Sequence, residues 1–354
     1  MAYTDIDDPS AYFQTRIFTG NENTLAVTFD GNSDLQPDWV WIKNRADNYN
    51  HSLFDSVRGV TKRIATNNDA IEATVAASLT AFNSNGFTLG NDTTANAPNN
   101  SHVSWNWKAG TSVSGNTSGS GTAKAYTGSV NTDAGFSIIR HLGNDTAGHT
   151  IPHHLGAVPK LIIGHGISGN DTTSWTVYHH TLGNTHTISF NETGAASDSS
   201  VWNDTTPTSS VISLGSSGNV NDADDAFILY SFAEKQGYSH FGSYTGNANA
   251  DGPFIYTGFK PAFFIYKSST TAGEEWKILD NKRDPFNRGS QRNLNVHANT
   301  VESDDTNSIG EFVSNGVKIR SAHQNINKSG DKYIYIAFAE QPFVTSTGVP
   351  ATAR

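Results

Sequence analysis

Clustered carboxylates are the first residues in this sequence whose types and spacing could support chemistry. Asp222, Asp224 and Asp225 occur together in the segment NVNDADDAF. Carboxylate oxygens gathered in one turn can hold Ca²⁺. The segment lacks the glycine and the distal glutamate of an EF-hand loop, so a polar turn before a strand is the stronger interpretation. We therefore predict no metal ion here.

A second set of acids could support glycoside hydrolysis, which needs two carboxyl groups facing each other across a groove. The candidates are Glu274, Glu275, Asp280 and Asp284. Their spacing does not place such a pair. The sequence also has no Gly-x-Ser-x-Gly motif between a strand and a helix, and no phosphate-binding loop. We therefore predict no catalytic residues, no enzymatic activity and no cofactor.

Histidine is the third candidate, because imidazoles bind transition metals when two or three of them converge. The chain has thirteen histidines, and eight of them lie in the middle of the sequence: His141, His149, His153, His154, His165, His179, His180 and His186. No His-x-His pair at strand spacing occurs there, so the pattern favours surface or interface histidines over a metal site.

Aromatic residues could bind sugars by stacking, but most of them fit a core better. Two tryptophan pairs alternate along strand-like runs: Trp39 with Trp41, and Trp105 with Trp107. Val40 and Ile42 are apolar, so the first run is predicted to be buried on both faces. Ser104 and Asn106 predict a half-exposed second strand. Aromatic residues on loops are the better binding candidates, and these are Tyr49, Trp202 and Phe286.

Composition limits the class of protein that must position these residues. The chain has 354 residues, no cysteine and a net charge of −10. It therefore has no disulfides, and it lacks the basic face that phosphate recognition requires, so nucleic acid is not a predicted partner. No run of apolar residues is long enough for a membrane span, and the N-terminal residues do not resemble a signal peptide. We expect synthesis in a cytoplasm, without export by a standard signal, and no membrane insertion.

Five short phrases recur in the same order three times, which is the clearest feature of the sequence. The first contains Gly20, Gly128 and Gly246, and the second places Pro37, Pro159 and Pro261 before apolar runs. The last phrase of each unit is HVSWNWKA, AFILYSFAE or YIYIAFAE. Each unit has about 110 residues, an ordinary size for one domain. We predict an N-terminal arm (1–15), a first β repeat (16–110), a flexible Gly/Ser/Thr linker (111–124), a second repeat (125–236), a third repeat (237–343) and a C-terminal tail (344–354).

The predicted fold is all-β, with three tandem antiparallel β-sandwich repeats of the lectin-like or jelly-roll-like kind. Abundant turn residues, β-branched residues and aromatic residues favour it. Residues 69–82 form the only helix-like stretch. Asn85-Gly86 and Asn315-Gly316 predict two-residue hairpin turns with positive φ at both positions. Tyr238 and Phe241 predict a packed junction between the second and third repeats.

Taken together, PDWVWIKNR, HSLFDSVRG, FNSNGFTLG, SWNWKAG and FGSYTGNANADGPFIYTGFKPAFFIYK resemble an uncharacterised repeat-domain family of virion proteins in marine bacteriophages. The resemblance extends from about residue 12 to residue 343 and transfers no catalytic residue. It implies a structural protein of the virion, in a tail fibre or tail tip that contributes to host attachment. Capsid decoration is the alternative position on the virion.

The partners implied by this resemblance are other virion proteins in the tail or capsid, with host surface glycan as a further ligand. A homotrimer or another symmetric assembly is expected. A glycan-binding module is the alternative from a different functional class, and a polysaccharide-degrading spike is the least favoured one.

Overall fold

The computed structural model describes residues 4–169 and 173–352, and antiparallel strands dominate them. The described helices are each three or four residues long: η1 (Pro9–Ala11), α1 (Thr93–Asn96) and α2 (Gln324–Asn327). Among the described residues, no helix has the length and apolar character needed to cross a membrane. The all-β prediction is confirmed.

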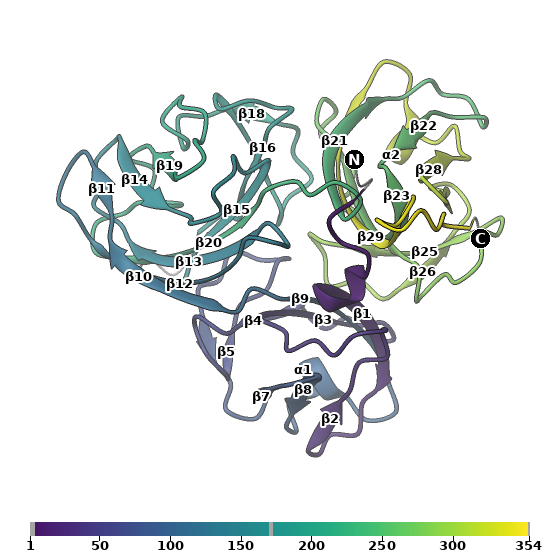
Figure 1. Cartoon of the computed structure of the whole chain (residues 1–354), viewed down its shortest axis with the longest axis horizontal. Helices are drawn as coiled ribbons and strands as arrows, with labels where there is room; N and C mark the ends of the chain where they lie inside the picture. The colour runs from purple at the N-terminus through teal and green to yellow at the C-terminus, as the bar shows by residue number, and fades with distance from the viewer. Residues whose placement is uncertain (1–3, 170–172, 353–354) are drawn as a thin grey trace.

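Three large antiparallel sheets surround the centre of the molecule (Figure 1). The first large sheet contains, in spatial order, β1 (Phe13–Thr19), β9 (Ser101–Trp107), β3 (Trp39–Asn44) and β4 (Ser52–Asp55). The second contains β10 (Thr111–Asn116), β12 (Ala125–Asn131), β13 (Phe136–Leu142), β20 (Ala226–Phe232), β15 (Leu161–Gly166), β16 (Thr176–His179), β17 (His186–Ser189) and β18 (Ser197–Asp198). The third contains β21 (Ser239–Thr245), β29 (Lys332–Pro342), β23 (Phe259–Ser268), β24 (Lys277–Asp280), β25 (Gln291–Asn295) and β26 (Ser303–Asp305). The pairing order β1-β9-β3-β4 recurs as β13-β20-β15-β16 and as β21-β29-β23-β24.

A smaller sheet packs on one face of each large sheet. The three small sheets contain β2 (Leu25–Val27), β8 (Gly86–Leu89) and β7 (Leu79–Asn83); β11 (Ser118–Gly119), β14 (His149–Pro152) and β19 (Val211–Leu214); and β22 (Phe254–Tyr256), β28 (Gly316–Ile319) and β27 (Gly310–Val313). A separate two-stranded sheet joins β5 (Lys62–Arg63) to β6 (Ala73–Thr74). Val40, Ile162 and Phe264 occupy corresponding positions and enter the three separate cores between large and small sheets.

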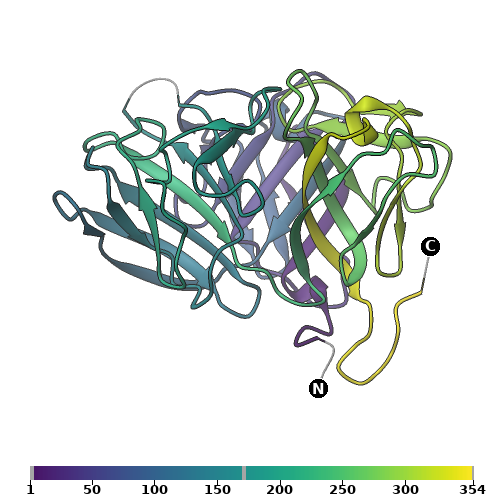
Figure 2. The same ribbon diagram turned by 90° about the horizontal axis from the view of Figure 1, so that it is seen from above.

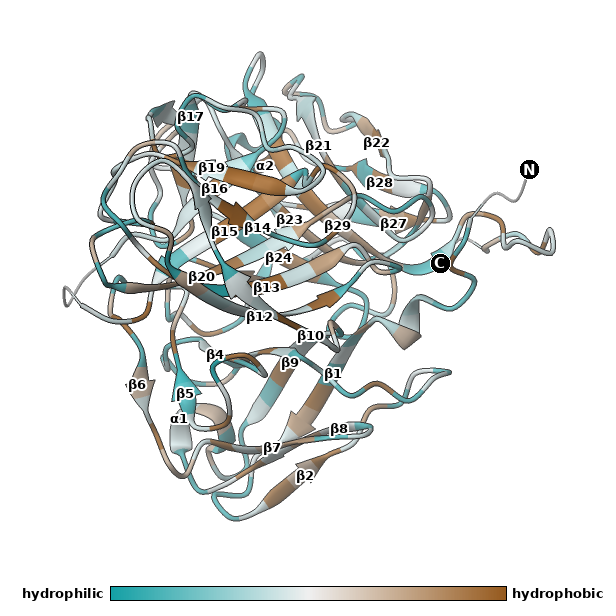
Figure 3. Ribbon diagram, turned by 60° about the vertical axis from the view of Figure 1, so that its left-hand side comes forward, coloured by the Kyte–Doolittle hydropathy of each residue, from teal (hydrophilic) through white to brown (hydrophobic). Residues whose placement is uncertain are grey.

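The opposite faces of the three large sheets share one aromatic core. Trp39 lies 4.5 Å from Trp107 of its own sheet and 4.6 Å from Tyr230 of the second, between ring centroids. Phe338 of the third sheet lies 5.5 Å from both Trp107 and Phe232. β15 carries a run of hydrophobic residues, 161–163, at its start (Figure 3). Because both faces of each large sheet are covered, their central strands are buried throughout.

A buried asparagine fixes a similar turn beside each of the three large sheets. We refer to each large sheet, together with the small sheet packed on it, as a unit. Asn96, Asn221 and Asn327 are fully buried, and each donates its side-chain amide to two or more backbone carbonyls nearby. The backbone carbonyls of these three asparagines also accept hydrogen bonds from backbone amides, those of Glu22, Asp145 and Ala248 respectively. All three donor residues have φ near +50°. The glycine at this turn is Gly20, Gly143 or Gly246, whose added Cβ would lie 2.1–2.2 Å from a carbonyl oxygen.

This turn corrects one predicted equivalence. Gly128 was expected to correspond to Gly20 and Gly246, but it lies inside β12, and Gly143 takes the equivalent place. β10 and β12 are additions that the other two large sheets do not have. The phrase YTGS therefore resembles FTGN and YTGN without sharing their position in the fold.

Three local predictions are also wrong. Residues 69–82 form no helix, because Leu79 is buried against the small sheet in β7 and Ala73–Thr74 pairs as β6. Residues 111–124 are not simply a flexible linker, since they contain β10 and β11, which pair with β12 and β14. β9 is not half-exposed: Ser104 and Asn106 are fully buried, and the Asn106 amide donates to Gln14 O over 2.9 Å and to Ser104 Oγ over 3.0 Å.

The two predicted hairpins exist, with turns shifted by one residue. Asn83 pairs with Gly86 and Val313 pairs with Gly316, so Asn85 and Asn315 each form the second turn residue. Gly86 has φ of +109°, whereas Asn85, Asn315 and Gly316 have no positive φ. Both glycines are required by space, since an added Cβ would lie 1.9 Å from Val27 O or 2.0 Å from Ile255 O.

Both ends of the described chain lie at one end of the molecule (Figure 2). The N-terminal arm packs inward, with Ile6 in the shared core and Thr4 Oγ1 donating to Gln236 O over 2.9 Å. The Ser346 amide donates to Asp7 Oδ1 over 2.6 Å, which joins the two terminal segments. Tyr238 and Phe241 are buried in the shared core, consistent with a packed junction.

Candidate binding site

A cavity of about 460 Å³ lies beside Tyr49. Its polar lining comes from Asn48, Tyr49, Asn50, Arg63, Asn68, Thr94 and Asn299. Its apolar lining includes Ile64, Ala65 and Ile71, of which Ile64 and Ala65 are buried. We call this site the Tyr49 cavity. Because Asn299 follows β25, the cavity is complete only when the first and third units are packed together.

Hydrogen bonds fix the orientation of the amides around the Tyr49 cavity. Asn48 Oδ1 accepts from Val301 N over 3.1 Å, and Asn50 Oδ1 accepts from Asn67 Nδ2 over 2.8 Å. Asn68 Oδ1 accepts from Ala70 N over 3.2 Å. Among the described residues, the Nδ2 groups of Asn48, Asn50 and Asn68 have no hydrogen-bond acceptor. Three amide donors therefore remain for a ligand.

Asn299 differs from the other three amides, because it is the donor that is already used. Its Nδ2 donates to the Asn48 backbone carbonyl over 3.3 Å, which leaves its Oδ1 as an acceptor. The guanidinium of Arg63 pairs with Asp92 over 2.9 Å, which neutralises the one basic side chain among the described residues of the lining. The cavity thus combines one aromatic ring, an apolar wall and uncharged polar groups.

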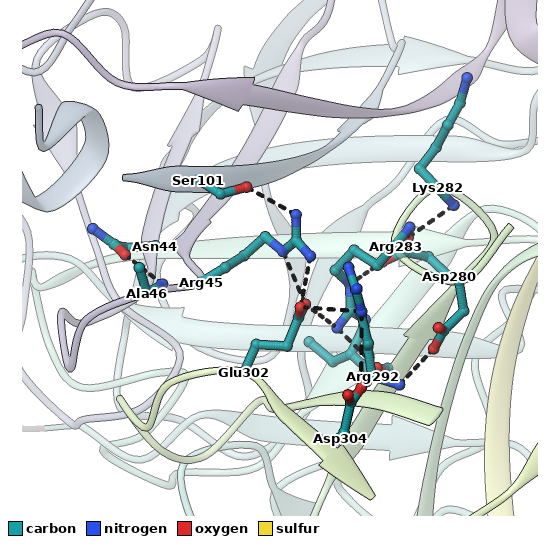
Figure 4. A network of polar contacts seen from close by, with 12 residues as sticks. Asn44, Arg45, Ala46, Ser101, Asp280, Lys282, Arg283, Arg292, Glu302 and Asp304 are labelled. Atoms are coloured by element: carbon teal, nitrogen blue, oxygen red, sulfur yellow. Dashed lines mark hydrogen bonds and ion pairs between the residues drawn. The ribbon is translucent and has the colours of Figure 1, made fainter. Parts of the chain in front are cut away.

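The end of β3 holds the segment that carries Tyr49. Asn44 Oδ1 accepts from the Ala46 and Asp47 amides, both over 2.9 Å (Figure 4). Lys43 is fully buried and donates to the Asn44 carbonyl over 2.6 Å. Burial lowers the pKa of Lys43 to about 8, against the opposing effect of Asp47. The segment is therefore anchored at its base by buried hydrogen bonds.

A buried ionic network joins the first and third units (Figure 4). Arg45 donates to Glu302 through Nε at 2.9 Å and through Nη2 at 2.6 Å. Arg283 contacts Glu302 at 3.1 Å and Asp280 at 2.5 Å, and Trp105 Nε1 donates to Asp280 over 3.0 Å. Burial alone would raise the pKa of Glu302, but the Arg45 hydrogen bond and the Arg283 charge lower it overall.

Corresponding positions connect the other two pairs of units. Asp55 pairs with Arg58 over 2.5 Å and accepts from the Tyr230 hydroxyl over 2.7 Å, which joins the first and second units. Between the second and third units, His179 takes the position of Asp55 and Asp280, and its Nε2 lies 3.2 Å from Tyr335 O. Burial lowers the pKa of His179 to about 3. This third contact is therefore neutral.

The predicted aromatic candidates occupy three different environments. Tyr49 is half-buried at the cavity, and Phe286 is 75% exposed at a separate surface site. Trp202 is fully buried, at a ring-centroid distance of 5.9 Å from Tyr178, so its ring presents no face to a ligand in this structure. Of the three, Tyr49 alone lines a cavity of ligand size.

The predicted calcium candidates lie close in sequence without forming a shared site. Asp224 pairs with Lys124, and Asp222 Oδ1 accepts from the Ala223 amide over 3.0 Å. The Asp225 carboxyl lies against Gly169, where an added Cβ would approach it to 1.9 Å. Across the described residues, no group of three or more His, Cys, Asp or Glu side chains is arranged to hold a metal ion.

The acids considered for glycoside hydrolysis are engaged in ion pairs or buried. Asp280 pairs with Arg283, Glu275 with Lys277 and Asp284 with Arg288. Glu274 is 4% exposed, and burial raises its pKa. Such an acid could donate a proton, but it belongs to no cavity that we find in the described chain.

Most of the central histidines are buried, and the expectation of surface positions is wrong for them. His141, His149, His153, His165 and His179 are fully buried, and their ring nitrogens bond to backbone or side-chain groups. The interface alternative holds for His165 and His179, which contact another unit. Burial lowers the pKa of His141 to about 3 and that of His153 and His165 to about 4.

Sequence reasoning identified Tyr49 but missed the amides and Arg63. Asn68 and Asn299 lie 19 and 250 residues from Tyr49, and asparagine is common in the loops of this chain. Only the packing of the first and third units brings these residues to one cavity.

One family model matches residues 8–342 of the chain, and its description reads "Domain of unknown function (DUF7483)". No curated protein and no solved structure matches the chain.

Proposed function

The chain belongs to the DUF7483 family, and we propose that it is a non-enzymatic structural protein of a bacteriophage virion, in a tail fibre or tail tip that contacts the host surface. The virion assignment rests on the resemblance of the repeated phrases. The shared aromatic core is the observation that favours a role in contact and assembly. It makes one chain a compact arrangement of three units, stabilised by buried apolar area instead of disulfides.

We further infer that the three units are tandem copies of one β-sandwich module. Their large sheets share the pairing order of four strands, and the same buried asparagine fixes the same turn in each. Polar contacts at corresponding positions run from the first unit to the second through Asp55, from the second to the third through His179, and from the third to the first through Asp280. This cyclic order is that of a trimer built within one chain.

The direction of the strands suggests how such a protein would be oriented. Phe13 and Trp39 both pair with Trp107 at one end of the first sheet, and β3 ends at Asn44, opposite His102, at the other end. The terminal segments lie near the Phe13 end, whereas the Tyr49 cavity follows Asn44. We propose that the end with the terminal segments contacts other virion proteins, in a symmetric assembly, and that the cavity end faces outward.

Immunogold labelling tests the proposal. Antibodies against the full chain should label purified particles of the phage whose genome encodes it, with gold confined to the tail tip or fibres. Labelling of the head would support capsid decoration instead. Absence of the chain from purified particles, measured in parallel by peptide mass spectrometry, would contradict a virion role.

A further inference from the structure

We propose that the Tyr49 cavity binds a neutral oligosaccharide, an inference that specifies the ligand of the proposed attachment function. Sugar rings present apolar C–H faces to aromatic rings and present hydroxyl groups to polar side chains around their edge. The cavity supplies the half-buried Tyr49 ring, an apolar wall at Ile64 and Ile71, and several amides. Its volume of about 460 Å³ lies within the usual range for small-ligand sites.

The amides are preorganised for hydroxyl and carbonyl oxygens. Because Oδ1 of Asn48, Asn50 and Asn68 already accepts a hydrogen bond from the protein, each side chain is held with Nδ2 as its remaining donor. Asn299 adds an acceptor, because its Nδ2 donates to the Asn48 carbonyl and its Oδ1 remains for a ligand. Groups held in place before binding lose little conformational entropy when the ligand arrives, so each hydrogen bond contributes more to affinity.

Charge favours a neutral ligand over an acidic one. Arg63, a basic residue in the lining, is paired with Asp92, so it does not offer an uncompensated positive charge. The whole chain carries a net charge of −10, which repels a polyanion at low ionic strength. Uronate-rich or sulfated chains should therefore bind less well than uncharged ones.

Binding of defined oligosaccharides to the purified full chain tests the inference. The probes are a glycan array, followed by titration calorimetry with tetrasaccharides of glucose and of N-acetylglucosamine and with tetragalacturonate as the acidic comparison. We expect binding of at least one neutral probe at millimolar concentration or below. Binding only to acidic probes, or to none on the array, would overturn the inference.

Variants identify the cavity as the site. Tyr49→Ala and Asn68→Ala should each weaken binding, and loss of the ring should cost about tenfold in affinity. Phe286→Ala is the matched control, because Phe286 is an exposed aromatic residue away from the cavity, and it should leave affinity unchanged. If Tyr49→Ala reduces the melting temperature, Asn68→Ala provides the test. Unchanged affinity in both cavity variants would exclude this site.

The saccharide-binding experiment and the particle-labelling experiment can fail independently of each other. Tail labelling without saccharide binding would refute only the ligand inference. Saccharide binding at Tyr49 by a chain that is absent from particles would refute the virion proposal and leave the binding site in place.

Discussion

Acidification should destabilise the protein through histidines that are buried where the units meet. His51 Nε2 lies 2.9 Å from Asn295 O, His165 Nε2 lies 3.1 Å from Ala70 O, and His179 Nε2 lies 3.2 Å from Tyr335 O. Each contact joins two different units. Burial lowers the pKa of His51 and His179 to about 3 and that of His165 to about 4, from 6.5 for an exposed histidine.

The sign and size of the effect follow from these values. A histidine whose pKa is lower in the folded state binds its proton more readily in the unfolded state, so stability falls as pH drops below 6.5 toward the folded-state pKa. Each pH unit in that window costs about 1.4 kcal/mol per histidine. At pH 5 each of the three therefore costs about 2 kcal/mol, or about 6 kcal/mol together, which is comparable to the whole stability of many domains.

Urea unfolding followed by tryptophan fluorescence measures this loss. The unfolding free energy should be lower at pH 5.0 than at pH 7.5 by at least about 6 kcal/mol, because other buried histidines add to the contribution of these three. His179→Gln should reduce the difference by about 2 kcal/mol, since glutamine does not titrate. His186→Gln is the control, because that side chain is 40% exposed. Equal stability at the two pH values would refute the reasoning, as would an equal effect of the control variant.

Three further substitutions test the packing. Trp107→Ala removes an aromatic residue from the shared core, so calorimetry should show a loss of about 3–5 kcal/mol for the whole chain, and an effect confined to one unit would contradict a shared core. Asp280→Asn removes the buried charge that pairs with Arg283, and denaturant titrations should show an unfolding free energy lower by about 3 kcal/mol. Asp224→Asn is the control: its side chain is 78% exposed, and its loss should cost less than about 1 kcal/mol. Gly143→Ala places a Cβ 2.1 Å from Asp222 O and should lower the unfolding free energy by about 1–3 kcal/mol. Gly194→Ala is the control, because its added Cβ would have no described atom within 4 Å. Similar melting temperatures for the two variants would argue against the recurring turn.

The sequence predicted the parts of the fold that depend on local pattern. The run Trp39–Ile42 is apolar at every position and follows a proline, and it is a buried strand, as expected. The same pattern argument predicted a half-exposed strand at Ser104 and Asn106, and this was wrong. A polar residue can be buried when a neighbouring strand supplies its hydrogen bonds. The helix predicted for residues 69–82 was also wrong, because helix propensity has a weaker influence on structure than the burial of Leu79.

Positions that depend on long-range packing could not be predicted from pattern alone. Gly128 lies inside β12, whereas Gly143 directly follows β13, and the contact with Asn221 identifies Gly143 as the glycine of the recurring turn. The Tyr49 cavity has the same origin. No local signal connects Asn299 to Tyr49, because the two residues meet only where the first and third units pack together. The hydrogen bond from Asn299 to Asn48 and the network of Arg45, Glu302 and Arg283 belong to this contact.

An electron cryomicroscopy reconstruction of intact particles tests the proposed function most directly. The account predicts density for this chain at the tail tip or fibre, with the joined terminal segments at Asp7 and Ser346 against other virion proteins and the Tyr49 cavity directed away from the particle. Particles that lack the chain, or density with the cavity end embedded in the virion, would contradict it.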